Sequence, residues 1–362
     1  MKQPVRVLVV DDSALMRKLI PQIIERDTSI QVVGTAMDGE FALKKIGELN
    51  PQVITLDLEM PRMGGMETLR EITRRYKLPV IVVSAHSTEG ASSTFKALAL
   101  GAFDFVAKPK DAASAHMDAI ATELITKIKV AAQTKFPSAV LKTTNVESRE
   151  APQKVFPVAQ QAATKVIAIG VSTGGPNAVQ YVLSQLPADF PGSIVIVQHM
   201  PEGFTEMFAH RLNESCAIQV KEAQSGDLLL AGRALICPGN RHIKVRRMPL
   251  GNIAVLSDEE KMNGHRPSVD VLFRSVAAEF GQQSVAILMT GMGEDGAEGL
   301  GMVKAAGGIT IAQSESSCVV YGMPKAAIER GYATRVVSLD AIANTIQAQC
   351  STGLSASSVG RD

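Results

Sequence analysis

The sequence is poor in residues that mark several classes of protein. It has no tryptophan, and aromatic residues make up only 4% of its 362 residues, so a surface that stacks nucleic-acid bases is not indicated. Acidic and basic residues almost cancel, 36 against 37, and without a basic stripe we expect no nucleic-acid partner. Apolar residues are plentiful at 46%, and a chain of this length predicts two buried cores rather than one.

Cysteine and long apolar runs are also scarce. The four cysteines are widely spaced along the chain, which argues against a zinc knuckle or a small disulfide scaffold and fits a reducing compartment. No apolar run is long enough to span a bilayer. The first strand-like run begins at Val5, so we expect no signal peptide. These features predict a cytoplasmic protein that is not embedded in a membrane.

The first 133 residues alternate short apolar runs with amphipathic segments. The runs cover residues 5–10, 31–36, 52–58, 79–85 and 103–108. Helical patterns lie between them, such as the apolar stripe from Leu15 to Ile24. Alternating β and α units predict a parallel, doubly wound sheet. In such a sheet the ligand binds beyond the carboxyl ends of the strands.

Polar side chains stand at the ends of these apolar runs. Asp11 and Asp12 follow the first run, and Asp57 lies near the end of the third. Ser84 lies at the end of the fourth run and Lys108 at the end of the fifth. Converging carboxylates repel unless a cation joins them, and oxygen ligands favour a hard ion such as Mg²⁺. Each aspartate alone could be a helix cap or a turn residue, but the whole set favours a site for a metal ion and a phosphoryl group.

This constellation resembles the receiver domain of two-component response regulators, which has a flavodoxin-like fold. The matching segments are VVDDS, LDLEMPRMGG, VVSA and GAFDFVAKP. The resemblance implies that Asp57 accepts a phosphoryl group from a histidine kinase. The Mg²⁺ ligands of the family fall on Asp11, Asp12 and Asp57. Its phosphoryl-binding lysine, its switch hydroxyl and its switch aromatic fall on Lys108, Ser84 and Phe105.

The regular alternation stops between residues 134 and 164, where three prolines and many polar residues predict an interdomain linker. We therefore predict a receiver domain over residues 1–133, a second domain over 165–350 and a disordered tail over 351–362. Strongly apolar strands alternate with helices in the second domain, which predicts a second doubly wound α/β fold with a mostly parallel sheet. Four short strands between residues 217 and 257 predict an antiparallel section.

The sharpest motif of the second domain is the stretch KVIAIGVSTGGP, from Lys165 to Pro176. A buried strand runs into a glycine-flanked serine, Ser172, where a helix begins. This position suits a nucleophile, and it also suits a phosphate group at a helix N-terminus. The phosphate alternative is the weaker one, because the stretch has neither G-x-G-x-x-G spacing nor a P-loop lysine. The pattern G-x-S-x-G is by itself only a weak indication of a nucleophile.

Two other strand ends supply possible partners for this serine. His199 follows the strand GSIVIVQ, and Asp295 follows the strand QSVAILMT after a short loop. Strand ends of a parallel sheet meet in one crevice, and a serine, an imidazole and a carboxylate are the groups that acyl transfer needs. His242 and His265 remain alternatives for the base. Asp270 remains an alternative for the acid, although it is more simply a carboxylate in the first turn of a helix.

The motifs of the second domain resemble the catalytic domain of the CheB family of chemotaxis protein-glutamate methylesterases. They are GVSTGGP, VQHMP, PGNRHIKV, HRPSVDVLF, LMTGMGEDGAEG and VYGMP, in this order from about Val166 to Ile346. The order of receiver, linker and esterase also matches the family. The resemblance implies a catalytic triad formed by Ser172, His199 and Asp295. It further implies no cofactor in the esterase site and two backbone oxyanion donors, the N–H groups of Thr173 and Met292.

The resemblance also implies a function. The chain would be a phosphorylation-regulated serine esterase that hydrolyses glutamyl methyl esters on methyl-accepting chemotaxis receptors, deamidates receptor glutamines and mediates chemotactic adaptation. A chemotaxis histidine kinase would be the phosphodonor. Glu294 stands where some relatives carry asparagine, and we expect the triad to survive its added charge. A different class stays open, namely a response regulator whose second domain only binds a nucleotide or a protein.

Overall fold

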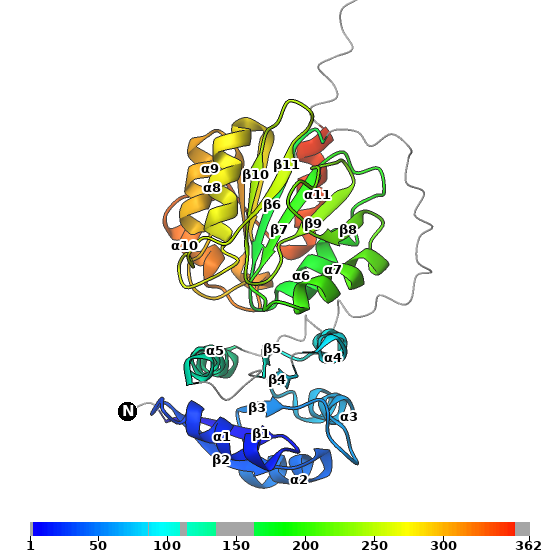
Figure 1. The fold of residues 1–362 in the computed structure, drawn as a ribbon. Coiled ribbons are helices and arrows are strands. Elements are labelled where there is room, and N and C mark those ends of the chain that lie inside the picture. Colours follow the sequence, from blue (N-terminus) through cyan, green and yellow to red (C-terminus); the bar gives the residue numbers. More distant parts are fainter. Residues whose placement is uncertain (1–2, 86, 109–113, 135–162, 352–362) are drawn as a thin grey trace, which may run out of the picture. The chain divides into compact units, whose positions relative to one another are not determined.

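The computed structural model of the chain describes residues 3–85, 87–108, 114–134 and 163–351. The chain divides into two units, Met1–Glu147 and Ser148–Asp362, and each unit is built around one large sheet (Figure 1). Nearly all of the predicted linker and tail lies outside the described residues, so the predicted domain boundaries remain predictions. No helix within the described ranges is both long and apolar enough to cross a membrane.

The first unit is a five-stranded parallel sheet with the order β2-β1-β3-β4-β5. Its strands are β1 (Val5–Val10), β2 (Ile30–Ala36), β3 (Val53–Leu56), β4 (Val80–Ser84) and β5 (Asp104–Ala107). Its helices are α1 (Ala14–Ile24), α2 (Gly39–Leu49), α3 (Gly65–Glu71) continued by the π-helical turn η1 (Ile72–Tyr76), α4 (Thr88–Ala99) and α5 (Ser114–Gln133). The predicted doubly wound receiver fold is confirmed.

Polar side chains fix where the helices of the first unit begin. Ser13, Asp38 and Ser87 are the N-cap residues of α1, α2 and α4, and each side chain accepts a hydrogen bond from a backbone N–H of the first turn. Such caps satisfy donors that a helix terminus otherwise leaves unpaired. Because α1 begins at Ala14, the loop that holds Asp11 and Asp12 is short, whereas Asp57 lies at the start of the longer loop between β3 and α3.

The second unit contains a seven-stranded sheet with the order β14-β13-β12-β6-β7-β9-β8 and a separate two-stranded sheet. Its strands are β6 (Val166–Val171), β7 (Ser193–Gln198), β8 (Gln219–Glu222), β9 (Arg233–Ile236), β10 (His242–Arg246), β11 (Ile253–Ser257), β12 (Ser284–Leu288), β13 (Ile309–Gln313) and β14 (Arg335–Val337). Its helices are α6 (Gly175–Leu183), α7 (Phe204–Ser215), α8 (Val269–Phe280) followed by η3 (Gly281–Gln283), α9 (Ala297–Ala305), η4 (Glu315–Ser317), α10 (Met323–Glu329) and α11 (Leu339–Ser351).

The antiparallel section is smaller than the sequence predicts. Strands β8 and β9 both join the large sheet in parallel, whereas β10 and β11 pair antiparallel. The expectation that all four short strands form an antiparallel section was therefore wrong for β8 and β9. The prediction rested on a series of short strands separated by turns, a pattern that usually indicates antiparallel pairing. Here the intervening loop returns the chain to the same end of the sheet without a helix.

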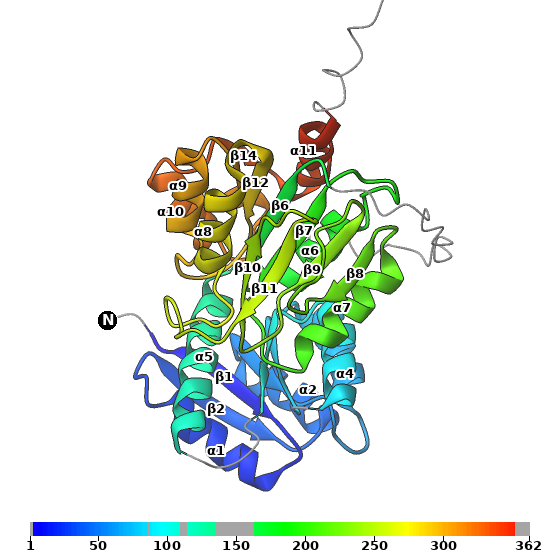
Figure 2. The same ribbon diagram turned by 45° about the horizontal axis from the view of Figure 1, so that its top comes forward.

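The hairpin β10–β11 lies on one face of the large sheet together with helices α8 and α9 (Figures 1 and 2). One buried cluster joins side chains of the hairpin, including Ile243 and Val245, to Leu272 of α8 and to Val195 and Val197 of the central strand β7. Burial of this kind contributes roughly 25 cal/mol for each Å² of apolar surface. The packed face therefore fixes the start of α8, which lies beside the carboxyl ends of the central strands.

Gly170 is a point of close approach between β6 and α8. A Cβ atom on Gly170 would lie 2.1 Å from Cγ1 of Val269, which is fully buried. Gly170→Ala is therefore expected to lower the stability of the second unit by about 1–3 kcal/mol, measured as a fall in its calorimetric unfolding midpoint. Gly47→Ala in α2 is the control and is expected to cause no loss of stability. A Cβ atom on Gly47 would have no other atom within 4 Å, and alanine favours a helix. An unchanged midpoint for Gly170→Ala would contradict this packing.

Candidate functional site

Three adjacent central strands end beside one another in the second unit. The order β12-β6-β7 places the loops that carry Asp295, Ser172 and His199 side by side at the carboxyl edge of the sheet. Val171, just before the serine, pairs in register with Gln198, just before the histidine. Neighbouring strands lie about 4.8 Å apart, so the sheet brings the loops of all three predicted residues to one place.

Backbone contacts hold Ser172 and His199 in fixed relation. The Ser172 N–H donates to the Thr290 carbonyl at 3.0 Å, and the His199 N–H donates to the Val171 carbonyl at 3.1 Å. The buried side-chain amide of Gln198 donates to the carbonyls of both Ser172 and His199, each at 3.1 Å. Sequence reasoning missed Gln198. The only available signal was its position as a polar residue at the end of an otherwise apolar strand.

His199 and Asp295 form a buried pair. His199 Nε2 lies 2.8 Å from Asp295 Oδ2, and within the described parts of the chain Nδ1 of His199 is buried without a hydrogen-bond partner. In the best-known serine hydrolases the aspartate contacts Nδ1 and the serine contacts Nε2. Here Asp295 contacts Nε2 instead, which leaves Nδ1 as the ring nitrogen able to accept a proton.

Asp295 is held ionised by several donors at the N-terminus of α8. Its oxygens accept hydrogen bonds from the Ser268 hydroxyl at 2.7 Å and from the Val269 backbone N–H at 2.7 Å. Burial opposes ionisation, but the hydrogen bonds from His199, Ser268 and Val269 outweigh it and hold the pKa of Asp295 well below its usual range. The helix N-terminus adds further stabilisation of the negative charge. The carboxylate is therefore charged at neutral pH.

The other candidates from the sequence occupy supporting places around this pair. Both ring nitrogens of the fully buried His242 are engaged, Nε2 with the Glu260 carbonyl at 3.0 Å and Nδ1 with the Ser268 N–H at 3.2 Å. Asp270 accepts a hydrogen bond from the Gly299 N–H at 2.6 Å, near the start of α9. His265 stacks on the His199 ring.

Glycines keep the surroundings of Ser172 open to backbone N–H groups. A Cβ on Gly291 would lie 2.8 Å from Cβ of Ser172 and 2.3 Å from Sδ of Met323. Among the residues that the structure describes, the backbone N–H groups of Thr173 and Met292 donate no hydrogen bond to the protein. Uncommitted N–H groups beside a nucleophile are what an oxyanion site requires.

Glu294 forms an exposed ion pair with Arg330. Its side chain is exposed and accepts a hydrogen bond from Arg330, whose guanidinium also lies 3.5 Å from Glu298. Ion pairs of this exposed kind contribute little to stability. The added negative charge beside Asp295 is therefore balanced locally.

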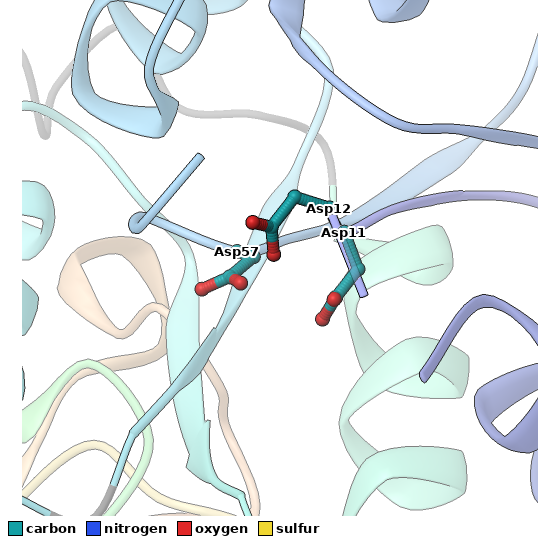
Figure 3. Close-up of side chains that lie close together, drawn as sticks. All are labelled: Asp11, Asp12 and Asp57. Carbon is teal, nitrogen blue, oxygen red and sulfur yellow. The ribbon is translucent and has the colours of Figure 1, made fainter. Parts of the chain in front are cut away.

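The first unit gathers three carboxylates at the carboxyl edge of its sheet. Figure 3 shows these three side chains close together. One ligand oxygen from each of Asp11, Asp12 and Asp57 lies within 4.8 Å of the other two. Lys108 Nζ lies 3.0 Å from Asp11 Oδ2 and 2.6 Å from Asp57 Oδ2. Burial raises the pKa of Asp11, while Lys108 opposes that rise. Three clustered carboxylates with one exposed member form a donor set that fits Mg²⁺ with some retained waters.

Ser84 and Phe105, the two residues predicted to act as switches, lie on the neighbouring strands β4 and β5, and both are buried. The Ser84 hydroxyl is buried and donates to the Gly90 carbonyl at 3.1 Å, at the start of α4. The Phe105 ring is buried, with its centroid 6.4 Å from that of Phe95 and 5.4 Å from Lys127 Nζ. Ser84 therefore points to α4 in this structure, and its predicted contact with a phosphoryl group requires a change of rotamer.

Comparisons with known proteins agree with both units. Residues 167–346 match the family described as CheB methylesterase, and residues 7–119 match the response regulator receiver domain. The chain is 63% identical over 349 residues to a Koribacter versatilis protein named protein-glutamate methylesterase/protein-glutamine glutaminase 2, covering 96% of each chain. It is 47% identical to a Halalkalibacterium halodurans protein named protein-glutamate methylesterase/protein-glutamine glutaminase, covering 97% of this chain and 99% of the relative.

A solved structure resembles the second unit. The crystal structure of the Thermotoga maritima CheB methylesterase catalytic domain is 38% identical, with a TM-score of 0.51. The match covers 52% of this chain and 99% of that one. The similarity therefore extends over a whole catalytic domain.

Proposed function

Because the chain belongs to the CheB methylesterase family and carries a receiver domain ahead of its catalytic domain, we propose that it is a phosphorylation-regulated serine esterase. Its substrates are glutamyl methyl esters on methyl-accepting chemotaxis receptors. The observation that carries this proposal is the 2.8 Å hydrogen bond between His199 and Asp295 at the strand end beside Ser172. Relatives are also named glutaminases, so the proposal includes deamidation of receptor glutamines, in the cytoplasm.

The first half of the reaction forms an acyl-enzyme. Ser172 Oγ attacks the ester carbonyl carbon while Nδ1 of His199 accepts the hydroxyl proton. Asp295 stabilises the imidazolium through Nε2, and the backbone N–H groups of Thr173 and Met292 donate to the oxyanion. Loss of one such donor costs about 3–4 kcal/mol of transition-state stabilisation. The carbon–oxygen bond to the methoxy group then breaks, and the imidazolium returns its proton so that methanol leaves.

The second half of the reaction releases the receptor carboxylate. Nδ1 of His199 takes a proton from water, and the resulting hydroxide attacks the acyl carbon. The bond to Ser172 Oγ breaks, the imidazolium reprotonates the serine, and a glutamate side chain is left on the receptor. A glutamine substrate follows the same steps, with ammonia leaving in place of methanol. Deamidation depends more strongly on proton donation by His199, because an amide nitrogen leaves only after it is protonated.

The receiver domain supplies the control. Asp57 accepts a phosphoryl group from a chemotaxis histidine kinase, and Asp11, Asp12 and Asp57 would hold Mg²⁺. When bound, the ion neutralises charge on the phosphoryl oxygens. Lys108, now between Asp11 and Asp57, then contacts the transferred group. Ser84 turns from the Gly90 carbonyl toward it, which leaves room for the Phe105 ring to move.

The test of the proposed activity uses the full chain and membranes that carry methylated receptors. We expect release of methanol above that from the membranes alone, together with conversion of receptor methyl-glutamate to glutamate seen by peptide mass spectrometry. Conversion of selected glutamines to glutamates in the same peptides would support the deamidase part. Binding to the receptors without methanol release would overturn the proposal and favour a second domain that only binds.

A small effect is expected at Glu294. Because this carboxylate is exposed and paired with Arg330, Glu294→Asn is expected to change kcat/KM for methanol release by no more than about twofold. Steady-state kinetics with methylated receptor membranes measures the effect. A tenfold change would mean that the charge at position 294 reaches the reacting groups.

A further inference from the structure

A tight turn outside the predicted triad contacts both the acid and the base. It runs from Met262 to His265, and its ends are joined by two backbone hydrogen bonds of 3.1 and 2.9 Å. Its central residues, Asn263 and Gly264, have φ angles of 53° and 79°. Positive φ at both central positions is the mark of a type I′ turn, for which Asn-Gly is the favoured sequence. The turn is therefore a rigid element with a defined direction for its side chains.

Asn263 contacts the acid. Its side-chain Nδ2 donates to Asp295 Oδ1 at 3.0 Å and to Asp270 Oδ2 at 2.7 Å. One amide group thus joins two buried carboxylates that would otherwise repel each other. Asp295 Oδ1 also accepts from Ser268, so the carboxylate has its orientation fixed from two sides.

His265 contacts the base. Its ring is stacked on that of His199, with the ring centroids 3.9 Å apart and the ring planes 6° from parallel. The bond from Nε2 to Asp295 fixes one edge of the His199 ring, but a single hydrogen bond leaves the ring free to tilt about that edge. The stacked ring of His265 prevents this tilt, and the direction in which Nδ1 of His199 points is therefore fixed.

We propose that the Met262–His265 turn is the positioning element of the catalytic pair, with Asn263 orienting the carboxylate of Asp295 and His265 orienting the ring of His199. The proposal rests on the proposed function, because it assigns His199 and Asp295 to catalysis. Neither Asn263 nor His265 is given a step with the substrate. Both act by keeping Nδ1 of His199 directed at the place where the serine proton is taken up.

The test compares paired substitutions in the full chain. His265→Ala removes the flat ring and is expected to lower kcat about tenfold to a hundredfold with KM within about twofold of wild type. His265→Phe keeps a flat ring without the imidazole nitrogens and is expected to recover most of that loss. Asn263→Asp keeps the size and tolerates the left-handed backbone, but it replaces the donor by an acceptor and is expected to lower kcat to a similar degree.

Matched controls separate positioning from general damage. Asn240 is exposed and also has a positive φ, 60°, and its side-chain oxygen accepts from Arg266, so Asn240→Asp is expected to retain wild-type kcat. His210 is exposed on α7, and His210→Ala is expected to do the same. Wild-type kcat in both His265→Ala and Asn263→Asp would overturn the proposal. An equal loss of kcat in His265→Phe and His265→Ala would also overturn it, because a flat ring at position 265 would then not be enough to orient His199.

A second readout does not depend on the activity. The chain has only six histidines, so the ring N–H proton that His199 shares with Asp295 can be followed by NMR after selective ¹⁵N-histidine labelling. We expect a strongly downfield signal that is retained in His265→Phe and broadened or shifted in His265→Ala. If wild type releases no methanol, the proposed function is wrong. The NMR signal would still show whether the turn positions His199 and Asp295. A signal unchanged in His265→Ala and Asn263→Asp would show that the turn does not position the pair.

Discussion

Ser172→Ala is expected to reduce kcat for methanol release from methylated receptors by about 10⁴- to 10⁶-fold. The substitution removes the only atom proposed to form the acyl-enzyme, and it leaves the backbone contacts of position 172 with Thr290 and Gln198 in place. The residual rate would come from substrate binding and the oxyanion donors alone. Steady-state methanol release by the purified full chain measures the effect, and thermal unfolding checks that the variant is folded.

A second serine provides the control for this substitution. Ser184 is exposed at the end of α6 and its hydroxyl donates to the Tyr181 carbonyl, so Ser184→Ala is expected to keep wild-type activity. Full activity in Ser172→Ala would show that Ser172 is not the nucleophile.

Asp295→Asn tests the proposed role of the Asp295 charge, because the substitution keeps the shape of the side chain and removes the charge. It is expected to lower kcat by about 10⁴-fold. When catalytic residues act together in one step, their individual effects on the activation free energy do not add. The double variant Ser172→Ala, Asp295→Asn is therefore expected to have the same kcat as Ser172→Ala alone. Losses that multiply instead would mean that the two residues act in separate steps.

The sequence allowed us to predict which residues gather at the carboxyl ends of the parallel strands. Apolar runs alternating with amphipathic segments are sufficient to predict parallel sheets, and in a parallel sheet the residues after each strand lie at one edge. Asp11, Asp12 and Asp57 come together for this reason, and so do the loops of Ser172, His199 and Asp295. The pairing of β8 with β9 was not predictable in the same way, because the length of a loop does not fix the direction in which the chain returns.

Side-chain directions within the site could not be predicted from spacing. Nothing in the spacing indicates which nitrogen of His199 contacts Asp295, since that depends on the ring torsion. The donors around Asp295 come from the start of α8 and from a turn that lies far from it in the sequence. The Asn-Gly pair at 263–264 was the one local signal, because it favours a type I′ turn, but the strand pairing alone did not show that this turn lies beside the acid.

Asp57→Asn is expected to abolish both phosphorylation and the activation that follows from it. An asparagine oxygen carries no negative charge, so it is a poor nucleophile toward phosphorus and a weak ligand for Mg²⁺. With radiolabelled acetyl phosphate as the donor, wild type is expected to become labelled only when Mg²⁺ is present, and removal of the ion with EDTA should prevent labelling. No label should appear on Asp57→Asn under either condition.

The same variant tests whether the receiver governs the esterase. Acetyl phosphate is expected to raise methanol release by wild type about fivefold to a hundredfold, the range typical of coupling between two sites, and to leave Asp57→Asn at its basal rate. Asp27→Asn is the control, since Asp27 lies outside the cluster in an ion pair with Lys129 and should respond as wild type does. Activation of Asp57→Asn by the phosphodonor would contradict control through Asp57. If wild type became labelled without any rise in methanol release, phosphorylation of the first unit would not activate the esterase of the second unit.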